Sequence, residues 1–207
     1  SFHLLTPLYD LGTALFGFGR RFKEGVVAQA GLADGARVLD VGCGTGQLAD
    51  ALKRAHPRAT VVGVDADPRI LEIARRRIAR AGHAGVELVC ARAERTGLEG
   101  ASFDTALSTL VFHHLPVEAK EGAVREITRL LRPGGRFLLV DLRPLMAVGR
   151  PLDPEGRRSM RLALRANTPE MLGVIFEEAG LEVDSVPAPQ TWIPLLRTFG
   201  LRATKPA

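Results

Sequence analysis

Three alternating glycines follow an apolar strand pattern and lead directly into a helical pattern. Gly42, Gly44 and Gly46 stand between the apolar run at 37–41 and a helix expected to begin at residue 46. Glycine adopts positive φ readily and leaves no side chain between the main chain and a ligand. The following helix N-terminus offers free N–H groups. The spacing predicts a cofactor-binding turn, and an ordinary glycine-rich connection is the alternative.

Two carboxylates indicate what this turn binds. Asp65 ends a second apolar run at 60–65, about twenty residues beyond the turn, where an acidic side chain accepts hydrogen bonds from ribose hydroxyls. Asp40 immediately precedes the turn and would repel the pyrophosphate of a dinucleotide. The same carboxylate suits a ligand that carries an ammonium or sulfonium group. S-adenosylmethionine combines a ribose, a cationic sulfur and an amino-acid end, so it is the predicted cofactor.

With these residues in place, the chain resembles the class I S-adenosylmethionine-dependent methyltransferases, of the broad group that includes the quinone C-methyltransferases. The resemblance covers roughly 38–141, and its motifs lie at 38–48, 64–68, 103–108, 113–115 and 131–137. It implies an α/β, Rossmann-like fold whose seven-stranded, mostly parallel sheet has an antiparallel last strand and helices on both faces. It also implies an enzyme that uses S-adenosylmethionine, releases S-adenosylhomocysteine and needs no metal.

The resemblance further implies which residues hold the cofactor. Asp40 and the backbone of the glycine turn would hold the methionine end, and Asp65 would take the ribose hydroxyls. Ala66 would touch the adenine, and 93–94 would lie at the adenine edge. The complete predicted set is Asp40, Gly42, Cys43, Gly44, Gly46, Asp65, Ala66, Ala93, Glu94, Ser108 and Thr109.

Two parts of this set need a comment. Related enzymes often have an aspartate before the alanine at the adenine edge, and this chain has Arg92 there. An arginine cannot accept a hydrogen bond, so Glu94 is the expected substitute acceptor. Ser108 and Thr109 come at the end of the fourth strand pattern and are expected to border the sulfonium.

Three residues are candidates for catalysis. His113 and His114 follow the fourth strand, where an imidazole can remove a proton from an attacking hydroxyl or amine, or bind a polar substrate group. The alternative is a pair of helix-start residues bonded to the backbone. Tyr9, followed by Asp10, resembles an N-terminal Tyr-Asp pair that closes over the cofactor in related enzymes, and a core aromatic is its alternative.

The acceptor is less well defined than the cofactor. The Phe- and Leu-rich segment 2–18 resembles that of quinone C-methyltransferases and bacterial phospholipid N-methyltransferases, and it favours a lipophilic substrate. Quinone enzymes carry Phe-Gly-Leu-Arg-Asn after the fourth strand, whereas 110–114 here reads Leu-Val-Phe-His-His. The leading prediction is therefore methyl transfer to a small or lipophilic acceptor at oxygen, nitrogen or carbon. A phospholipid amine is its specific case, and a quinone carbon is the alternative.

The elements that must position these residues follow from the alternation of short and long apolar runs, which predicts a parallel sheet covered by helices. Strands are expected at 36–41, 60–65, 86–90, 103–109, 135–141, 181–186 and 197–204, and helices at 46–55, 68–81, 117–131, 154–166 and from 168 to about 180. All 207 residues are expected in one domain. Within it, 1–30 would be an N-terminal lid segment, 31–142 the cofactor core and 143–167 a second lid.

Composition narrows the partners. The net charge of +5 suggests an anionic partner, but the charge is spread along the chain. One Trp and one Tyr are a poor supply for base stacking, so no nucleic acid is expected. No signal peptide or apolar run near twenty residues is seen, which predicts a cytoplasmic protein. The arginine-rich 154–166 is interpreted as a solvated lid helix or as a peripheral contact with an anionic membrane. The sequence does not define an oligomeric state.

Two other function classes stay open at this point. Gly44-x-Gly46-x-x-Ala49 also fits part of a dinucleotide fingerprint, so a nicotinamide-dependent oxidoreductase is one alternative. A protein that binds S-adenosylmethionine without consuming it is the other. Cys43 and Cys90 are too few for a disulfide framework or a metal cluster and are expected to be structural.

Overall fold

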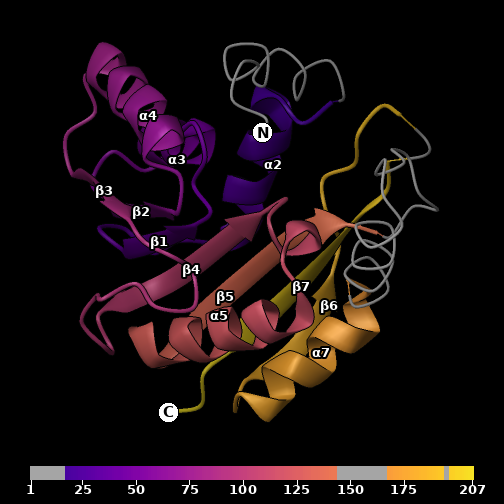
Figure 1. The fold of residues 1–207 in the computed structure, drawn as a ribbon. Coiled ribbons are helices and arrows are strands. Elements are labelled where there is room, and N and C mark those ends of the chain that lie inside the picture. The colour runs from indigo at the N-terminus through magenta and orange to yellow at the C-terminus, as the bar shows by residue number, and fades with distance from the viewer. Residues whose placement is uncertain (1–16, 144–166, 194–195) are drawn as a thin grey trace.

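The structure is a computed structural model that describes residues 17–143, 167–193 and 196–207. Its centre is a seven-stranded sheet with the strand order β3-β2-β1-β4-β5-β7-β6 (Figure 1). The strands are β1 (Arg37–Val41), β2 (Thr60–Asp65), β3 (Val86–Cys90), β4 (Phe103–Thr109), β5 (Leu131–Leu142), β6 (Glu182–Val186) and β7 (Thr198–Thr204). Strands β1 to β5 pair in parallel, and β7 runs antiparallel to both β5 and β6. The predicted fold class, including the antiparallel last strand, is confirmed.

Helices cover both faces of this sheet. They are α2 (Arg20–Ala30), α3 (Gln47–Ala55), α4 (Pro68–Ala81), α5 (Val117–Leu130) and α7 (Pro169–Glu178), with the short 3-10 helix η1 at Phe112–His114. Figure 1 shows α2, α3 and α4 on one face and α5 and α7 on the other. Alternate residues of each strand belong to two apolar clusters on opposite faces of the sheet. Val38 and Val61 lie in the cluster formed with α2 and α3, and Leu39 and Val62 lie in the cluster formed with α5 and α7. The central strands are therefore buried on both faces, as a parallel sheet requires.

Apart from shifts of one or two residues at the ends of elements, the structure differs from the sequence prediction in two places. Helix α2 was not predicted, because a run of basic residues hides its apolar stripe of Phe22, Val26 and Ala30, which is buried in the core. Strand β5 begins at Leu131 rather than at 135. The register of β4 and β5 shifts between Phe103 and Thr105, and this bulge lets the glycine-containing segment remain part of the strand.

Some predictions lie outside the described residues. They include Tyr9, the helix expected at 154–166, most of the N-terminal lid segment and most of the second lid. Within the described ranges, none of the helices is long and apolar enough to cross a membrane.

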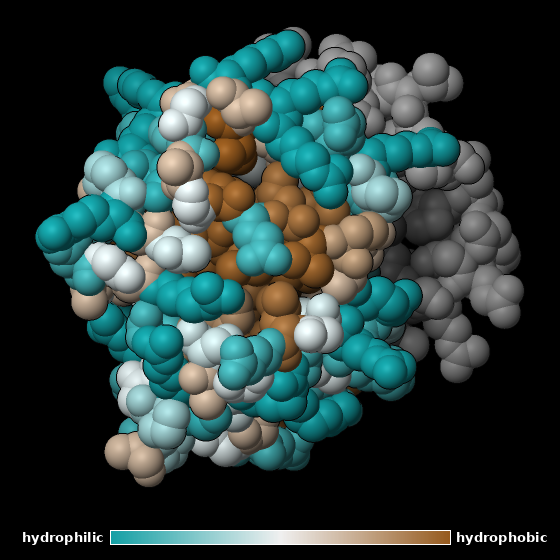
Figure 2. Space-filling view, turned by 90° about the vertical axis from the view of Figure 1, so that its left-hand side faces the viewer, coloured by the Kyte–Doolittle hydropathy of each residue, from teal (hydrophilic) through white to brown (hydrophobic). Residues whose placement is uncertain are grey.

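Strand β3 forms one edge of the sheet. Along it, Val86, Leu88 and Val89 are half-buried, and Glu87, between the first two of them, is exposed. Figure 2 looks onto this side of the molecule and shows a hydrophobic area around one hydrophilic residue, bordered by further hydrophilic side chains. A charged residue on an edge strand disfavours pairing with another strand.

Candidate functional site

The glycine turn joins β1 to α3 at the carboxyl end of the sheet. The N–H groups of Gly42 and Cys43 both donate to the carbonyl of Val64, at 2.8 and 3.0 Å. Gly42, Gly44 and Gly46 have φ values of 72°, 53° and 77°, which side-chain-bearing residues rarely adopt. The predicted turn is therefore present, and β2 holds its first residues.

Two of these glycines serve different purposes. A Cβ on Gly42 would lie 2.4 Å from Cγ2 of Val111, so a side chain has no room there. A Cβ on Gly44 would meet nothing within 4 Å. Gly42 thus permits packing against the segment after β4, whereas the backbone at Gly44 faces open space that a ligand can enter.

Alanine substitutions should separate these two purposes. We expect Gly42→Ala to lower the free energy of unfolding by about 2 kcal/mol, because it adds an overlap with Val111 to the strain of positive φ. Gly44→Ala should lower it by about 1 kcal/mol, from positive φ alone. Chemical denaturation of the two variants measures the difference, and equal losses would show that the Val111 contact is unimportant.

Asp65 links the end of β2 to the glycine turn. Its Oδ2 accepts a hydrogen bond from the Gly44 N–H at 2.9 Å, and its Oδ1 accepts one from the Asp67 N–H at 3.0 Å. Each carboxylate oxygen has two lone pairs, so both can accept a further bond from a ligand hydroxyl. The two backbone amides hold the carboxylate in one orientation at the predicted ribose position.

Asp40 is a buried carboxylate without a complete set of partners. It is 1% exposed, and its Oδ2 has no hydrogen-bond partner among the described residues. Burial raises its pKa to about 7, against the opposing attraction of Lys23, and nearby Asp65 raises it further. An unsatisfied buried oxygen of this kind fits a ligand that brings a cationic donor.

Cys43 has a structural role in the turn. It is buried, and burial raises the pKa of its thiol, so the reactive thiolate is disfavoured. A Cβ on Gly63 of β2 would lie 2.9 Å from the Cys43 sulfur, so the glycine in that strand makes room for the cysteine. Cys90 is exposed at the end of β3.

The predicted adenine edge is a tight turn after β3. Ala93 and Glu94 lie between Arg92 and Arg95, whose backbones form an isolated antiparallel β-bridge. Ala66, which follows β2, is exposed. Oε1 of Glu94 accepts a hydrogen bond from Nε of Arg92 at 2.6 Å. Arg92 therefore holds one oxygen of the carboxylate that was expected to accept from adenine.

Ser108 and Thr109 end β4 with different environments. The Ser108 hydroxyl donates to the Val41 carbonyl at 3.0 Å and is fully buried, so it joins β4 to β1. The Thr109 hydroxyl is buried and has no hydrogen-bond partner within the described part of the chain. Thr109 is thus the one of the two whose hydroxyl is still available to a ligand at this strand end.

His113 is held by a carboxylate from the neighbouring strand. Leu110, at a φ of 62°, turns the chain from β4 into η1 and brings His113 over the end of β5. Its Nδ1 lies 2.6 Å from Oδ1 of Asp141, and its backbone N–H donates to Oδ2 of Asp141 at 3.2 Å. Asp141 is fully buried and also accepts from the Leu142 N–H at 2.6 Å. This arrangement fixes both the backbone and the ring of His113.

Two more titratable groups lie beside this pair. The ring centroids of His114 and His113 are 3.9 Å apart. Desolvation is the larger cause that lowers the pKa of His114, and the charge of His113 is the smaller one. Lys120 of α5 is fully buried; desolvation lowers its pKa to about 8, and the attraction of Asp141 opposes that change.

Sequence reasoning gave no role to three of these residues: Asp141, Lys120 and Lys23. The strand pattern before Asp141 ends in a carboxylate just as the pattern before Asp65 does, so the same argument would have found it. The burial of Lys120 and the proximity of Lys23 to Asp40 arise from helix packing and leave no local sequence signal. Among the described residues, no group of three or more His, Cys, Asp or Glu side chains could hold a metal.

Comparisons with known proteins identify the family of this chain. A family profile described as a methyltransferase domain matches residues 38–135. The chain is 30% identical to the ubiquinone/menaquinone biosynthesis C-methyltransferase UbiE of Syntrophotalea carbinolica, over 97% of this chain and 84% of that protein. It is 35% identical to the protein of the same name from Pseudomonas putida, over 68% of this chain but 56% of that relative.

Solved structures share the fold. A SAM-dependent methyltransferase from Aquifex aeolicus superimposes with a TM-score of 0.74 at 22% identity, over 96% of both chains. Phosphoethanolamine N-methyltransferase 2 of Haemonchus contortus, in complex with phosphomonomethylethanolamine and S-adenosylhomocysteine, gives 0.77 at 18% identity, over 100% of this chain and 58% of that one.

Proposed function

This chain belongs to the class I S-adenosylmethionine-dependent methyltransferases, and on that premise we propose that it methylates a lipophilic acceptor whose attacking group loses a proton to His113. The observation that carries the proposal is the 2.6 Å contact between His113 Nδ1 and the buried carboxylate of Asp141. That contact lies at the carboxyl ends of β4 and β5, the edge of the sheet where open α/β folds bind their ligands.

The cofactor position follows from the same edge. When bound, S-adenosylmethionine supplies an activated methyl group on a cationic sulfur. The unsatisfied oxygen of Asp40, the open backbone at Gly44 and the oriented carboxylate of Asp65 fit its cationic and ribose groups. We propose that Asp40 and the glycine turn hold the methionine end, that Asp65 holds the ribose, and that Thr109 borders the sulfonium.

Asp141 would act on the reaction through His113. A carboxylate can only accept, so its bond to Nδ1 favours the tautomer with the proton on Nδ1 and leaves Nε2 as the acceptor. The His113 side chain is 15% exposed, which limits competition from water. Nε2 would then take the proton of the attacking hydroxyl or amine, and the fixed ring would orient that group.

Two kinds of lipophilic acceptor remain candidates for this base. The names of the two UbiE relatives support a quinone-type substrate in its reduced, hydroquinone form. Loss of a ring hydroxyl proton to His113 would activate the neighbouring ring carbon, which takes the methyl group as S-adenosylhomocysteine leaves, and the proton on that carbon is then released to water. A phospholipid amine, the specific case within the leading sequence prediction, would use the same base. Either acceptor would bring the enzyme to a membrane surface as a peripheral protein, and we include that contact in the proposal. The nicotinamide alternative gains no support from the comparisons.

Transfer of labelled methyl groups tests the proposal directly. The purified protein would be incubated with methyl-labelled S-adenosylmethionine and a total cell extract, and the products would be partitioned between organic solvent and water. Label in the organic phase is expected, and its mass would distinguish a quinone from a phospholipid. Label confined to water would contradict a lipophilic acceptor, and no transfer would favour the non-catalytic binding alternative.

Asp40 predicts how cofactor affinity depends on pH. Because its pKa is about 7 in the ligand-free protein, the carboxylate is mostly protonated below pH 7 and attracts a cationic ligand poorly. The Kd of S-adenosylmethionine should therefore fall up to tenfold for each pH unit between about 5.5 and 7, and then level off. Isothermal titration at several pH values measures this slope. Asp40→Asn should remove it, and an unchanged slope in that variant would assign the titration to another group.

The same shift has a defined effect on stability. Since burial raises the pKa of Asp40 from 3.8, the folded state binds this proton more tightly than the unfolded state does. The stabilising contribution of Asp40 in the ligand-free protein is fully present below about pH 4 and is lost as the pH rises through about 7. Cofactor affinity and ligand-free stability thus respond to pH in opposite directions at this residue.

A further inference from the structure

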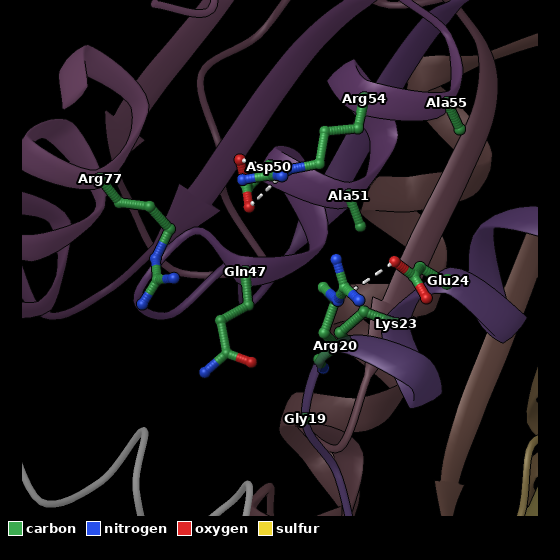
Figure 3. Close-up of a pocket in the computed structure, with 10 residues that line it drawn as sticks. All are labelled: Gly19, Arg20, Lys23, Glu24, Gln47, Asp50, Ala51, Arg54, Ala55 and Arg77. Atoms are coloured by element: carbon green, nitrogen blue, oxygen red, sulfur yellow. Dashed lines mark hydrogen bonds and ion pairs between the residues drawn. The ribbon is translucent and has the colours of Figure 1, made fainter. Parts of the chain in front are cut away.

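A charged cleft lies on the helical face beside the glycine turn. It has a volume of about 570 Å³ and lies between α2, α3 and α4 (Figure 3). Its lining residues are Gly19, Arg20, Lys23, Glu24, Gln47, Asp50, Ala51, Arg54, Ala55 and Arg77. Ala51 and Ala55 lie one turn apart on α3, and their short side chains leave space that the longer charged side chains surround.

The cleft carries an excess of positive charge. Four of its residues are cationic and two are carboxylates. Both carboxylates already form ion pairs: Asp50 with Nε of Arg54 at 3.2 Å, and Glu24 with Nε of Arg20 at 3.5 Å (Figure 3). Asp50 is also bonded to His83 at 2.7 Å. The lining is thus two charges more positive than negative.

Polar groups from three helices converge on this space. Nε of Arg77 donates to the Thr45 carbonyl at 2.8 Å, which holds the guanidinium beside the glycine turn. Figure 3 shows Gln47, the first residue of α3, extending into the region between Arg77 of α4 and Arg20 of α2. The arrangement presents planar guanidinium donors and an amide donor to one volume.

We propose that this cleft binds a phosphate monoester, carried by a lipid headgroup or by a soluble phosphate ester. Guanidinium groups match phosphate oxygens with paired hydrogen bonds. A phosphate monoester carries between about −1.5 and −2 charges at pH 7, which complements the charge excess of the lining. The site goes beyond the proposed methyl transfer and is tested without it, so the failure of one leaves the other standing.

Calorimetry with inorganic phosphate and glycerol 3-phosphate as probes tests the site. The full chain would be titrated both without and with saturating S-adenosylhomocysteine, and ionic strength would be kept low because screening weakens such contacts. We expect both probes to bind. The double variant Arg20→Gln/Arg54→Gln should raise the Kd of each probe at least about tenfold. The matched control, Arg75→Gln/Arg76→Gln, removes two α4 arginines that pair with Glu72 outside the cleft and should leave both Kd values unchanged.

Vesicles identify the source of the phosphate. The protein would be sedimented with phosphatidylcholine vesicles that contain phosphatidic acid. If the cleft variant no longer sediments with them and the control variant still does, the site is supported and its ligand is a lipid. Binding of glycerol 3-phosphate without cleft-dependent sedimentation supports the site and assigns it to a soluble ester. Three results would overturn the proposal: no binding of either probe, a cleft variant that loses no more affinity than the control variant, or binding seen only without S-adenosylhomocysteine. The last would assign the cations to the cofactor carboxylate.

Discussion

Asp65→Ala should raise the Kd for S-adenosylhomocysteine roughly a hundredfold, corresponding to about 3 kcal/mol. Two ribose hydroxyls would lose a charged acceptor, and each such hydrogen bond contributes about 1.5 to 3 kcal/mol. The substitution also removes the acceptor that fixes the Gly44 and Asp67 amides, so the glycine turn would lose part of its preorganisation. Titration calorimetry with the purified variant measures the change.

Asp67→Ala is the matched control for this experiment. It removes the same charge two residues away, and Asp67 caps α4 by accepting from the Arg69 N–H at 2.9 Å. We expect it to lower the free energy of unfolding by about 1 kcal/mol and to leave cofactor affinity within about threefold. Similar affinity losses in both variants would indicate a general electrostatic effect and would contradict the ribose assignment.

The fold could be predicted largely because its local patterns agree with one another. The apolar runs of β1, β2 and β4 are short and buried on both faces, and Asp67-Pro68 marks the start of α4 as a cap and a first-turn proline. Where the patterns conflicted, the prediction missed an element. Helix α2 has a buried stripe interrupted by charged residues, and only its packing against α3 makes it recognisable.

The candidate site could be predicted only in part, for a related reason. The carboxylates and glycines lie at ends of predicted strands, so their convergence at one edge follows from a parallel sheet. The contact between His113 and Asp141 joins residues 28 positions apart through the positive φ of Leu110, which no sequence pattern announces. The hydrogen bond from Arg92 to Glu94 likewise depends on the side-chain rotamers within one tight turn, which the sequence does not specify.

His113→Ala should lower kcat by a factor of roughly 10² to 10⁴ once an acceptor is in hand, the range typical for loss of a general base. Cofactor affinity should change little, because His113 is bonded to Asp141 and not to the glycine turn or Asp65. Single-turnover kinetics with labelled S-adenosylmethionine measure the chemical step, and S-adenosylhomocysteine titration measures the binding. In the variant, kcat should also no longer vary with the protonation of a base as the pH changes.

Two further variants decide whether His113 acts as a base or merely fills space. Asp141→Asn keeps the shape of the side chain but places an amide near the N–H donors of His113 and Leu142, so it should disturb the ring and lower kcat at least tenfold. His114→Ala removes the adjacent ring, whose Nδ1 is not held by Asp141, and should lower kcat less than tenfold. If His114→Ala is the more damaging variant, the base is His114. If neither histidine affects kcat, the enzyme works by positioning its two substrates alone, which an already activated methyl donor permits.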